Sequence, residues 1–236
     1  MNDIQYLRMS DDGINYLDYS EFMKVPCGIV TRNDNLSNGE IDDFIIKFIK
    51  ANLGKKNNSG DLKLAKLNQK HTNTIIPADS NLINPADGTF TDSADHILTI
   101  RTADCFPVFL SDGVRVSLIH AGWRGALAGI VDKFFRNVKN FDIDNCRALI
   151  GPGIGSCCFE VSSEVAILSE SRYRSRKQGK YYVDIKRLIL DEMKKHGVKY
   201  IMESDDCTAC NIDKFYSYRQ EGIKVKQMIS FIHVGG

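Results

Sequence analysis

Three side chains that bind soft or borderline metal ions stand where apolar stretches meet polar loops. His71 follows the stretch LKLAKLNQK, Cys105 precedes FPVFL, and His120 ends VRVSLI. A catalytic zinc ion takes about three protein ligands from His, Cys, Asp and Glu and keeps one position open for water or substrate. The three residues could converge at strand ends and form such a site, although a buried thiol and two hydrogen-bonded imidazoles would fit the same spacing.

The motif HAGWRG at 120–125 favours a functional interpretation of His120. It places a His, a Trp and an Arg around two glycines, directly before an apolar helical stripe that begins at Gly125. The first backbone N–H groups and the positive dipole end of such a helix attract an anion. A loop that only supports packing rarely needs this combination, so Arg124 is a candidate contact for phosphate or ribose.

The remaining cysteines give weaker signals. Cys207 and Cys210 form a C-x-x-C pair, which fits a redox motif or half of a structural zinc site, and most simply a structural role. A complete zinc site would need a second pair of ligands. Cys157 and Cys158 are adjacent in the chain, so we expect their side chains to diverge and to serve in packing.

Composition and charge point to a chain that acts on a small molecule. The 236 residues are 43% hydrophobic, which suffices for one substantial core, and we expect a single domain over residues 1–236. With 31 basic against 30 acidic residues, the net charge of +1 provides no field that would attract nucleic acid or an anionic membrane.

The same features predict a cytoplasmic protein. The N-terminal stretch has no basic and apolar signal segment, and the longest apolar runs are much shorter than the roughly 20 residues of a membrane span. Seven cysteines in a reducing compartment are a poor basis for a disulfide framework. We expect a monomer or a small homo-oligomer.

Hydrophobic periodicity predicts an α+β fold. Helices are expected over 41–53, from Gly125 through Val138, near 163–170, and from the N-cap Asp184 to Gly197. Strands are expected in the apolar runs that begin at residues 27, 62, 96, 106, 114, 146, 200 and 226, with hairpins dominating the middle. The polar segments 55–60 and 171–180 are predicted to be loops, and the second is the best candidate for disorder.

Five motifs make the chain resemble the laccase-domain proteins, a family once called polyphenol oxidases and now regarded as purine nucleoside phosphorylases with adenosine deaminase activity. The motifs are NQKH at 68–71, TADCFPV at 102–108, HAGWRG at 120–125, IGPGIGSCCFEV at 150–161, and CTAC with FYSYR at 207–219. They cover most of the chain, and HAGWRG together with an upstream TADC is highly specific.

The resemblance implies a fold and a ligand set. The fold is a four-layer α/β/β/α sandwich with mixed sheets in one domain. The implied metal ligands are His71, Cys105 and His120, with Zn²⁺ as the native ion and Cu²⁺ as an occasional occupant. Lys70, the stretch NDNLSNG at 33–39 and the triplet IKV at 223–225 depart from the family's usual residues, and they are expected to concern the pocket rim rather than the metal.

The activities implied by the resemblance are phosphorolysis of adenosine, inosine and methylthioadenosine, and deamination of adenosine. Purine nucleosides and phosphate are therefore the expected partners. Deamination requires a water molecule, activated by the metal, to attack C6, and Asp104 or Glu160 is a candidate to move its proton. Arg124 and Arg219 are candidates for binding phosphate, and Tyr218 for stacking on the purine. For Arg219, a surface salt bridge is an equally good interpretation.

Three other functions can be weighed against the sequence. Five histidines are too few for a true multicopper oxidase, which uses on the order of ten, so copper-dependent polyphenol oxidation would be incidental. The main alternative is a cysteine hydrolase in which His120 activates Cys105 without a metal, and tolerance to the loss of His71 would distinguish it. A regulatory protein without turnover is the third interpretation. We interpret His96, His196 and His233 as structural.

Overall fold

The computed structural model describes residues 6–53, 61–79 and 84–235, so the loop expected at 55–60 lies outside the described residues. Two six-stranded sheets form the centre of the structure. The first sheet contains, in spatial order, β1 (Leu7–Met9), β2 (Asn15–Asp18), β3 (Cys27–Val30), β15 (Met228–His233), β7 (His96–Thr102) and β4 (Lys63–Lys66). The second contains β14 (Tyr200–Glu203), β10 (Arg147–Ile150), β8 (Phe106–Ser111), β9 (Val116–Ala121), β6 (Gly88–Thr91) and β5 (Ile75–Pro77).

Both sheets are mixed, which confirms the predicted α+β class. The pairs β4–β7, β10–β14 and β5–β6 are parallel, and the other neighbours in these sheets are antiparallel. The β8–β9 hairpin is the most important pair for the site because its register sets Pro107 opposite His120. Cys105, directly before β8, therefore lies beside the end of β9.

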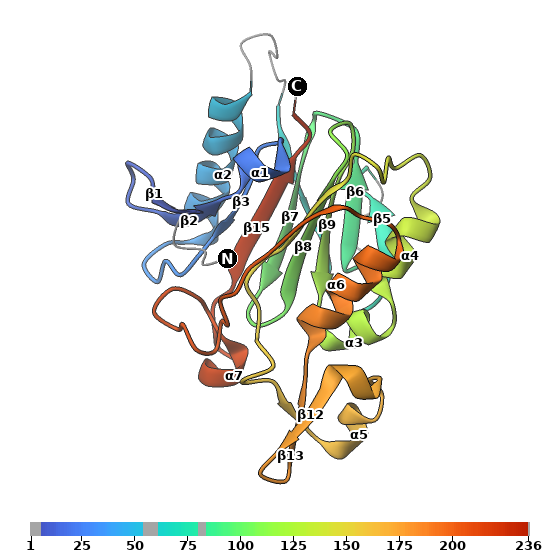
Figure 1. Ribbon diagram of the computed structural model, residues 1–236. Helices are drawn as coiled ribbons and strands as arrows, with labels where there is room; N and C mark the ends of the chain where they lie inside the picture. The colour runs from blue at the N-terminus through green and yellow to red at the C-terminus, as the bar shows by residue number, and fades with distance from the viewer. Residues whose placement is uncertain (1–5, 54–60, 80–83, 236) are drawn as a thin grey trace.

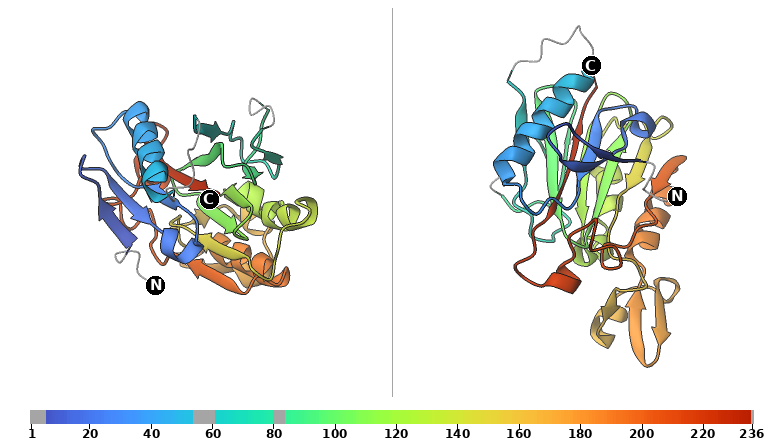
Figure 2. Two further views of the ribbon diagram at one scale, coloured as in Figure 1. Left: turned by 90° about the horizontal axis from the view of Figure 1, so that it is seen from above. Right: turned by 90° about the vertical axis from the view of Figure 1, so that its left-hand side faces the viewer.

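Alternation of side chains along the strands produces the four layers (Figures 1 and 2). Phe109 and Leu118 of the second sheet pack with Ile232 and other residues of the first, in a core between the two sheets. Phe231 and its alternate neighbours face α2 (Asn38–Asn52) instead. On the far side, residues such as Val108 and Ile119 pack against α3 (Trp123–Leu127), α4 (Ile130–Asn137) and α6 (Ile185–Lys195). The order is helix, sheet, sheet, helices.

Helix α2 matches the segment predicted to be helical. Ser37 is its N-cap, and the Ser37 hydroxyl accepts a hydrogen bond from the Glu40 N–H while the Glu40 carboxylate accepts one from the Ser37 N–H. This capping box satisfies two backbone donors that the first turn leaves unpaired. The buried face carries Phe44, Ile45, Phe48 and Ile49 at helical spacing.

The helix predicted from Gly125 through Val138 is wrong in one respect, because the structure divides it into α3 and α4. Gly129 has φ of +72°, a left-handed conformation that glycine adopts without steric cost and that ends a right-handed helix. The apolar stripe continues across the break, so periodicity alone did not reveal it. Helix α3 has only 5 residues, which weakens the argument that its dipole attracts an anion.

The predicted helix after Asp184 is confirmed, whereas the disorder predicted for 171–180 is contradicted. The Asp184 carboxylate accepts a hydrogen bond from the Arg187 N–H, and Gly197 follows the helix with φ of +86°. Residues 174–183 form a hairpin of β12 (Arg174–Lys177) and β13 (Lys180–Val183), whose turn places Gln178 and Gly179 at positive φ. With β11 (Glu160–Val161) they make a small sheet that projects from the two large sheets (Figure 1).

The remaining helical elements are one turn each: α1 (Ser20–Met23), α5 (Ser163–Ala166), the 3₁₀ turn Ser171–Tyr173 and α7 (Tyr218–Glu221). None of the described helices has the length and apolar character that crossing a membrane requires. The single domain over 1–236 stays a prediction.

Candidate active site

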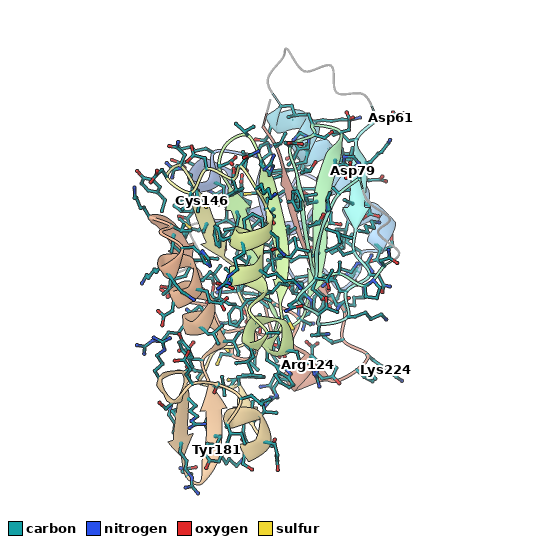
Figure 3. The ribbon with its side chains drawn as sticks, turned by 90° about the vertical axis from the view of Figure 1, so that its right-hand side faces the viewer. Asp61, Asp79, Arg124, Cys146, Tyr181 and Lys224 are labelled. Atoms are coloured by element: carbon teal, nitrogen blue, oxygen red, sulfur yellow. The ribbon has the colours of Figure 1, made fainter. Side chains whose placement is uncertain are left out.

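A cavity of about 810 Å³ opens at one end of the two large sheets. Loops that follow β4, β7 and β9 line it, together with α3 and the chain around α7. Figure 3 places Arg124 and Lys224 at this end of the molecule and Asp61 at the opposite end. The size is in the range of pockets that bind small molecules, which run from about 300 to 1,000 Å³.

His71, Cys105 and His120 meet in the wall of this cavity. One ligand atom from each lies within 4.8 Å of those of the other two, and Nε2 of His71 lies 3.7 Å from Sγ of Cys105. The exposure of the three side chains is graded: His120 is buried, Cys105 is half-buried and His71 is exposed. One side of the cluster therefore opens toward the cavity, as a catalytic metal site requires.

A buried carboxylate, Asp87, holds two of the three residues in place. Its Oδ1 lies 2.7 Å from Nδ1 of His120 and also accepts a hydrogen bond from the His71 N–H at 3.0 Å. Its Oδ2 accepts hydrogen bonds from the N–H and the hydroxyl of Thr72. Because Nδ1 of His120 is engaged by Asp87, Nε2 is left as the ring atom that can bind a metal.

Asp87 was missed by the sequence reasoning. It stands in an Ala-Asp-Gly segment before β6, where Asp and Gly indicate a turn and nothing marks a partner for a histidine. The contact joins residues that are 33 positions apart in the sequence. Only the folded structure reveals it.

The backbone conformation around the cluster allows His71, Cys105 and the chain at Gly122 to lie close together. His71 and Asp104 have φ of +58° and +83°, a left-handed conformation that is uncommon for residues with a Cβ and concentrates at functional sites. A Cβ at Gly122 would lie 2.7 Å from Cδ2 of His71 and 3.0 Å from Sγ of Cys105, so a larger residue there would force both side chains to shift. The first glycine of HAGWRG therefore serves the cluster directly.

Mutual electrostatic effects shift the pKa values of Cys105, His120 and Asp87. Burial opposes ionisation of Cys105, but hydrogen bonding to His120 and His71 outweighs it and lowers the thiol pKa to about 7. Burial also opposes a charge on His120, whereas Asp87 and Cys105 stabilise it and raise its pKa to about 9. For Asp87, burial is outweighed by His120 and Thr72, which lower its pKa to about 2. The Cys105 thiol is therefore readily ionised near neutral pH.

The donor set of the cluster fits a zinc-type ion. It offers a thiol whose pKa is lowered to about 7, two imidazoles, and an outer carboxylate that orients one of them. Three soft or borderline ligands with an open side toward a cavity match the coordination that catalytic zinc prefers.

Asp104, a candidate for proton transfer, is buried and accepts a hydrogen bond at each of its carboxylate oxygens. Its Oδ1 accepts a hydrogen bond from the Thr208 hydroxyl and its Oδ2 one from the Arg219 N–H, both at 2.7 Å. The carboxylate lines the cavity but serves to tie the loop before β8 to the CTAC segment and to α7. These contacts favour a positioning role over a proton shuttle.

The other predicted site residues separate into two groups. Arg124, Tyr218 and Arg219 line the same cavity as the cluster of two histidines and Cys105. Glu160 does not line it and forms an ion pair with Lys180 at 2.9 Å. Arg101, which the sequence reasoning did not single out, is a further arginine in the lining.

The two predicted phosphate contacts differ in how they are held. Arg219 donates through its guanidinium to the carbonyl oxygens of Cys158 and Glu160, at 3.3 and 2.8 Å, rather than to a surface carboxylate. The Arg124 guanidinium stacks over the Trp123 ring at 4.3 Å, and no carboxylate pairs with it within the described part of the chain. Arg124 is the cation with more capacity left for an anion.

The three remaining histidines lie outside the cavity lining. His96 begins β7, His196 forms the C-cap of α6 and contacts Asp132 at 2.9 Å, and His233 on β15 contacts the Ala94 carbonyl at 2.9 Å.

Comparisons with known proteins identify the family of the chain. The family model described as Multi-copper polyphenol oxidoreductase laccase matches residues 45–235. The purine nucleoside phosphorylase of Aquifex aeolicus is 30% identical over 166 residues, which are 70% of this chain and 80% of that protein. A purine nucleoside phosphorylase of Pseudomonas aeruginosa is 34% identical over 166 residues, 65% of this chain and 67% of that protein.

A solved structure extends the likeness to the fold. The crystal structure of a Neisseria meningitidis protein superposes with a TM-score of 0.75 at 27% identity, and the match covers 90% of this chain and 95% of that one. Since the family model spans 45–235, far more than half of the sequence, the chain belongs to the multi-copper polyphenol oxidoreductase laccase family.

Proposed function

We propose that the chain is a metal-dependent purine nucleoside phosphorylase acting on adenosine, inosine and methylthioadenosine, with adenosine deaminase activity. The observation that carries the proposal is the His71, Cys105 and His120 cluster, which opens into a cavity that also contains several arginines. Relatives named purine nucleoside phosphorylase support the same reaction class.

The cluster is proposed to hold Zn²⁺, with Cu²⁺ as an occasional occupant and any polyphenol oxidation as incidental. Zinc held there would supply Lewis acidity, polarising a substrate oxygen or activating a water molecule. The chain's own contribution is to fix the ligands. Asp87 sets the ring orientation of His120, and the turn at Gly122 leaves room for His71 and Cys105.

Phosphate is proposed to bind to arginines of the cavity lining. Arg101, Arg124 and Arg219 line the cavity. The lining carboxylate among the described residues is Asp104, which accepts hydrogen bonds from the Thr208 hydroxyl and the Arg219 N–H. The excess of positive charge favours an anion. Arg124 supplies a planar donor set that Trp123 holds from one face.

The purine is proposed to bind against aromatic and apolar residues of the cavity lining. Tyr218 is 56% exposed and lines the cavity with Trp123, Phe159 and Ile223. An exposed tyrosine with a flat face is suited to stack on a base. Phosphorolysis then joins a phosphate oxygen to C1′ while the bond from C1′ to the purine nitrogen breaks, and positioning of both reactants supplies much of the acceleration.

Turnover of inosine with and without phosphate tests the proposal. We expect hypoxanthine and ribose 1-phosphate in equal amounts, at a rate that saturates with phosphate. The variant Arg124→Ala should raise the KM for phosphate more than that for inosine, while Arg136→Ala, an exposed arginine on α4 paired with Asp132, serves as the matched control. Base release that does not depend on phosphate would contradict the proposal.

A cysteine hydrolase remains the second candidate because the structure supplies an orienting group that the sequence did not indicate. Asp87, His120 and Cys105 form a chain of contacts in which Asp87 orients the imidazole beside a thiol of lowered pKa, about 7. His71→Ala separates the two candidates: a metal site loses activity with this ligand, whereas a Cys105 and His120 pair keeps most of it.

A further inference from the structure

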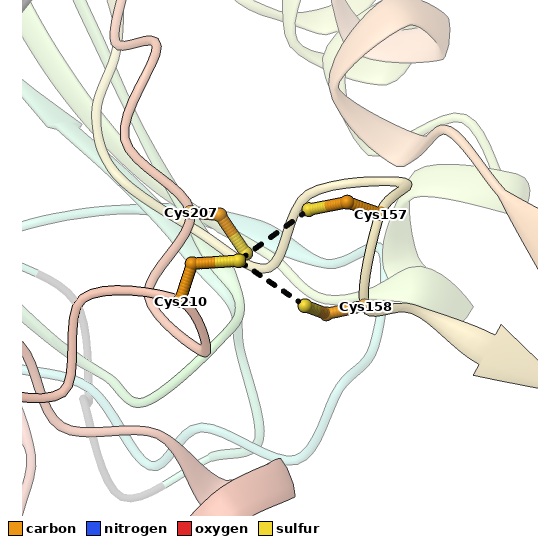
Figure 4. A group of neighbouring side chains, drawn as sticks. All are labelled: Cys157, Cys158, Cys207 and Cys210. Atoms are coloured by element: carbon orange, nitrogen blue, oxygen red, sulfur yellow. Dashed lines mark hydrogen bonds between the residues drawn. The ribbon is translucent and has the colours of Figure 1, made fainter.

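Four cysteines outside the cavity lining converge on one point (Figure 4). The sulfur atoms of Cys157, Cys158, Cys207 and Cys210 all lie within 4.8 Å of one another. Sγ of Cys210 is 3.7 Å from Sγ of Cys157 and 3.3 Å from Sγ of Cys158. The prediction that the adjacent cysteines diverge is therefore wrong.

A tight turn brings the adjacent cysteines to the same side. The N–H groups of Cys158 and Phe159 both donate to the Gly155 carbonyl, at 3.0 and 2.9 Å, so the chain reverses across Ser156 and Cys157. Alternating side chains of an extended strand would point apart, but a turn removes that alternation. Gly155 allows the close packing, since a Cβ there would lie 3.1 Å from Sγ of Cys157 and 3.3 Å from Cβ of Cys207.

The C-x-x-C segment is folded to present both of its thiols. The Cys207 carbonyl accepts hydrogen bonds from the N–H groups of Cys210 and Asn211, each at 3.1 Å, which closes a turn over Thr208 and Ala209. The Gly155 N–H donates to Sγ of Cys207 at 3.1 Å. A backbone donor aimed at sulfur stabilises negative charge on a thiolate, the form that binds metals.

The arrangement of the four sulfur atoms indicates the class of ligand. A tetrahedral zinc ion with Zn–S bonds of about 2.3 Å places its sulfur ligands about 3.8 Å apart. The sulfur separations of 3.7 and 3.3 Å at Cys210 are close to that value and far above the S–S bond of about 2.05 Å. A disulfide to Cys210 would also use only one of its two neighbours.

We propose that Cys157, Cys158, Cys207 and Cys210 form a second metal site, which binds one thiophilic divalent ion of the Zn²⁺ type in a structural role. With four protein ligands the site is closed, so it offers no position for substrate. Cys157 and Cys210 are exposed, which leaves the ion a route of entry. Binding displaces protons from the thiols and changes no oxidation state.

The ion would brace one wall of the active-site cavity. Thr208, between Cys207 and Cys210, donates its hydroxyl to the Asp104 carboxylate next to Cys105. The Arg219 guanidinium donates to the Cys158 carbonyl at 3.3 Å. Fixing the four cysteines therefore fixes the segments that carry Asp104 and Arg219, although the ion itself lies outside the cavity lining.

Metal counting on the full chain, purified under reducing conditions without a metal-affinity tag, tests the second site. We expect about two zinc ions per chain in the unmodified protein, about one in Cys105→Ala, and about one in the double variant Cys207→Ser, Cys210→Ser. Cys146→Ala removes a buried thiol from outside both clusters and should keep the full count. A double variant that retains the unmodified count would overturn the proposal.

Spectroscopy on Cys105→Ala separates the second site from any failure of the proposed function or of folding in the double variant. Cobalt added to this variant should give intense sulfur-to-metal charge-transfer bands, and X-ray absorption of its zinc form should show four sulfur neighbours at about 2.3 Å. Nitrogen or oxygen neighbours would contradict the site. So would a metal-free chain whose mass, under the same reducing conditions, is lower by the two hydrogens of a disulfide.

Discussion

The two sulfur-containing clusters of this protein are neighbours in the fold but differ in composition and in what they face. The open cluster consists of His71, Cys105 and His120, which offer three mixed ligands and open into a cavity of about 810 Å³. The closed cluster consists of the four cysteines 157, 158, 207 and 210, which offer a complete set of thiols and line no part of that cavity. The number of ligands and the presence of an open side, rather than the mere presence of cysteine, distinguish a site for chemistry from a site for stability.

The largest expected difference between the clusters is in catalytic activity. Cys105→Ala removes a proposed metal ligand at the open cluster. If the proposed function holds, this variant should lower kcat/KM for inosine on the order of 10³-fold, because the several kcal/mol that a catalytic metal supplies would be lost. Cys210→Ser removes a ligand at the closed cluster and should cost less than about tenfold, through looser positioning. Equal losses in steady-state assays of the two variants would show that the distinction is wrong.

Dependence of metal affinity on pH should be steep at the open cluster. The metal-free Cys105 thiol has a pKa of about 7 and the His120 imidazole one of about 9, and both must lose their protons to bind zinc. Affinity should therefore rise with pH, by about tenfold per unit between pH 7 and 9, where mainly the His120 proton is displaced. Competition with a chelator, measured on the Cys207→Ser, Cys210→Ser variant, isolates this cluster. A flat profile would contradict the assignment of His120 as a ligand.

Asp87, the carboxylate that contacts His120 at the open cluster, should give the next largest effect on metal affinity and activity when it is changed. Asp87→Asn keeps the shape but removes the charge that orients His120, and should lower zinc affinity or activity by about 10- to 100-fold. Asp144→Asn, at an exposed ion pair with Lys199, is the matched control and should change neither. If the two variants behave alike in the chelator competition, Asp87 has no role in orienting the ligand.

Each cluster has a glycine in close contact, which allows a paired test. Gly122→Ala would force a Cβ to within 2.7 Å of His71 and 3.0 Å of Cys105, so zinc affinity at the open cluster should fall by about tenfold or more. Gly155→Ala meets Cys157 at 3.1 Å and should affect only the closed cluster, to a smaller extent. An effect of Gly155→Ala on zinc affinity at the open cluster would show that the two clusters are not separable.

The hydrogen bond that links the clusters should give the smallest effect on activity and a measurable one on stability. Thr208→Val removes the hydroxyl that donates to the buried Asp104 carboxylate. Loss of this partner should lower the free energy of unfolding by about 1–3 kcal/mol. Thr99→Val, which removes a buried hydroxyl bonded to the Ala65 carbonyl in the first sheet, is the control for activity: it should destabilise the chain without affecting turnover.

Much of the fold was predictable because local patterns and burial agree. The apolar faces of α2 and α6 stand at helical spacing, and Asp184 marks where α6 begins, whereas α2 begins directly after its N-cap Ser37, earlier than the predicted start at residue 41. The break at Gly129 was not predictable from periodicity, since the apolar stripe continues through it. The β12–β13 hairpin was not predicted because β12 (RSRK) is entirely polar and basic, although Gln178 and Gly179 are suited to its turn.

The candidate site also contains some features that could be predicted from the sequence and others that could not. Cys105 and His120 could be placed at adjoining strand ends, because a hairpin between two apolar runs sets them side by side. Asp87 could not, because its partner His120 is distant in sequence and its own neighbours indicate only a turn. The convergence of Cys157 and Cys158 depends on the turn at Gly155, which overrides the divergence expected of adjacent residues.

In the proposed function, catalysis depends on an ion held by His71, Cys105 and His120. The most direct measurement is phosphate-dependent cleavage of inosine by the chelator-treated, metal-free chain while zinc is added back in steps, with bound metal counted in the same samples. We predict negligible turnover without metal and recovery that follows occupancy of the open cluster, and no recovery in His71→Ala. Full turnover by the metal-free chain would contradict the account and would assign the chemistry to Cys105 and His120 alone.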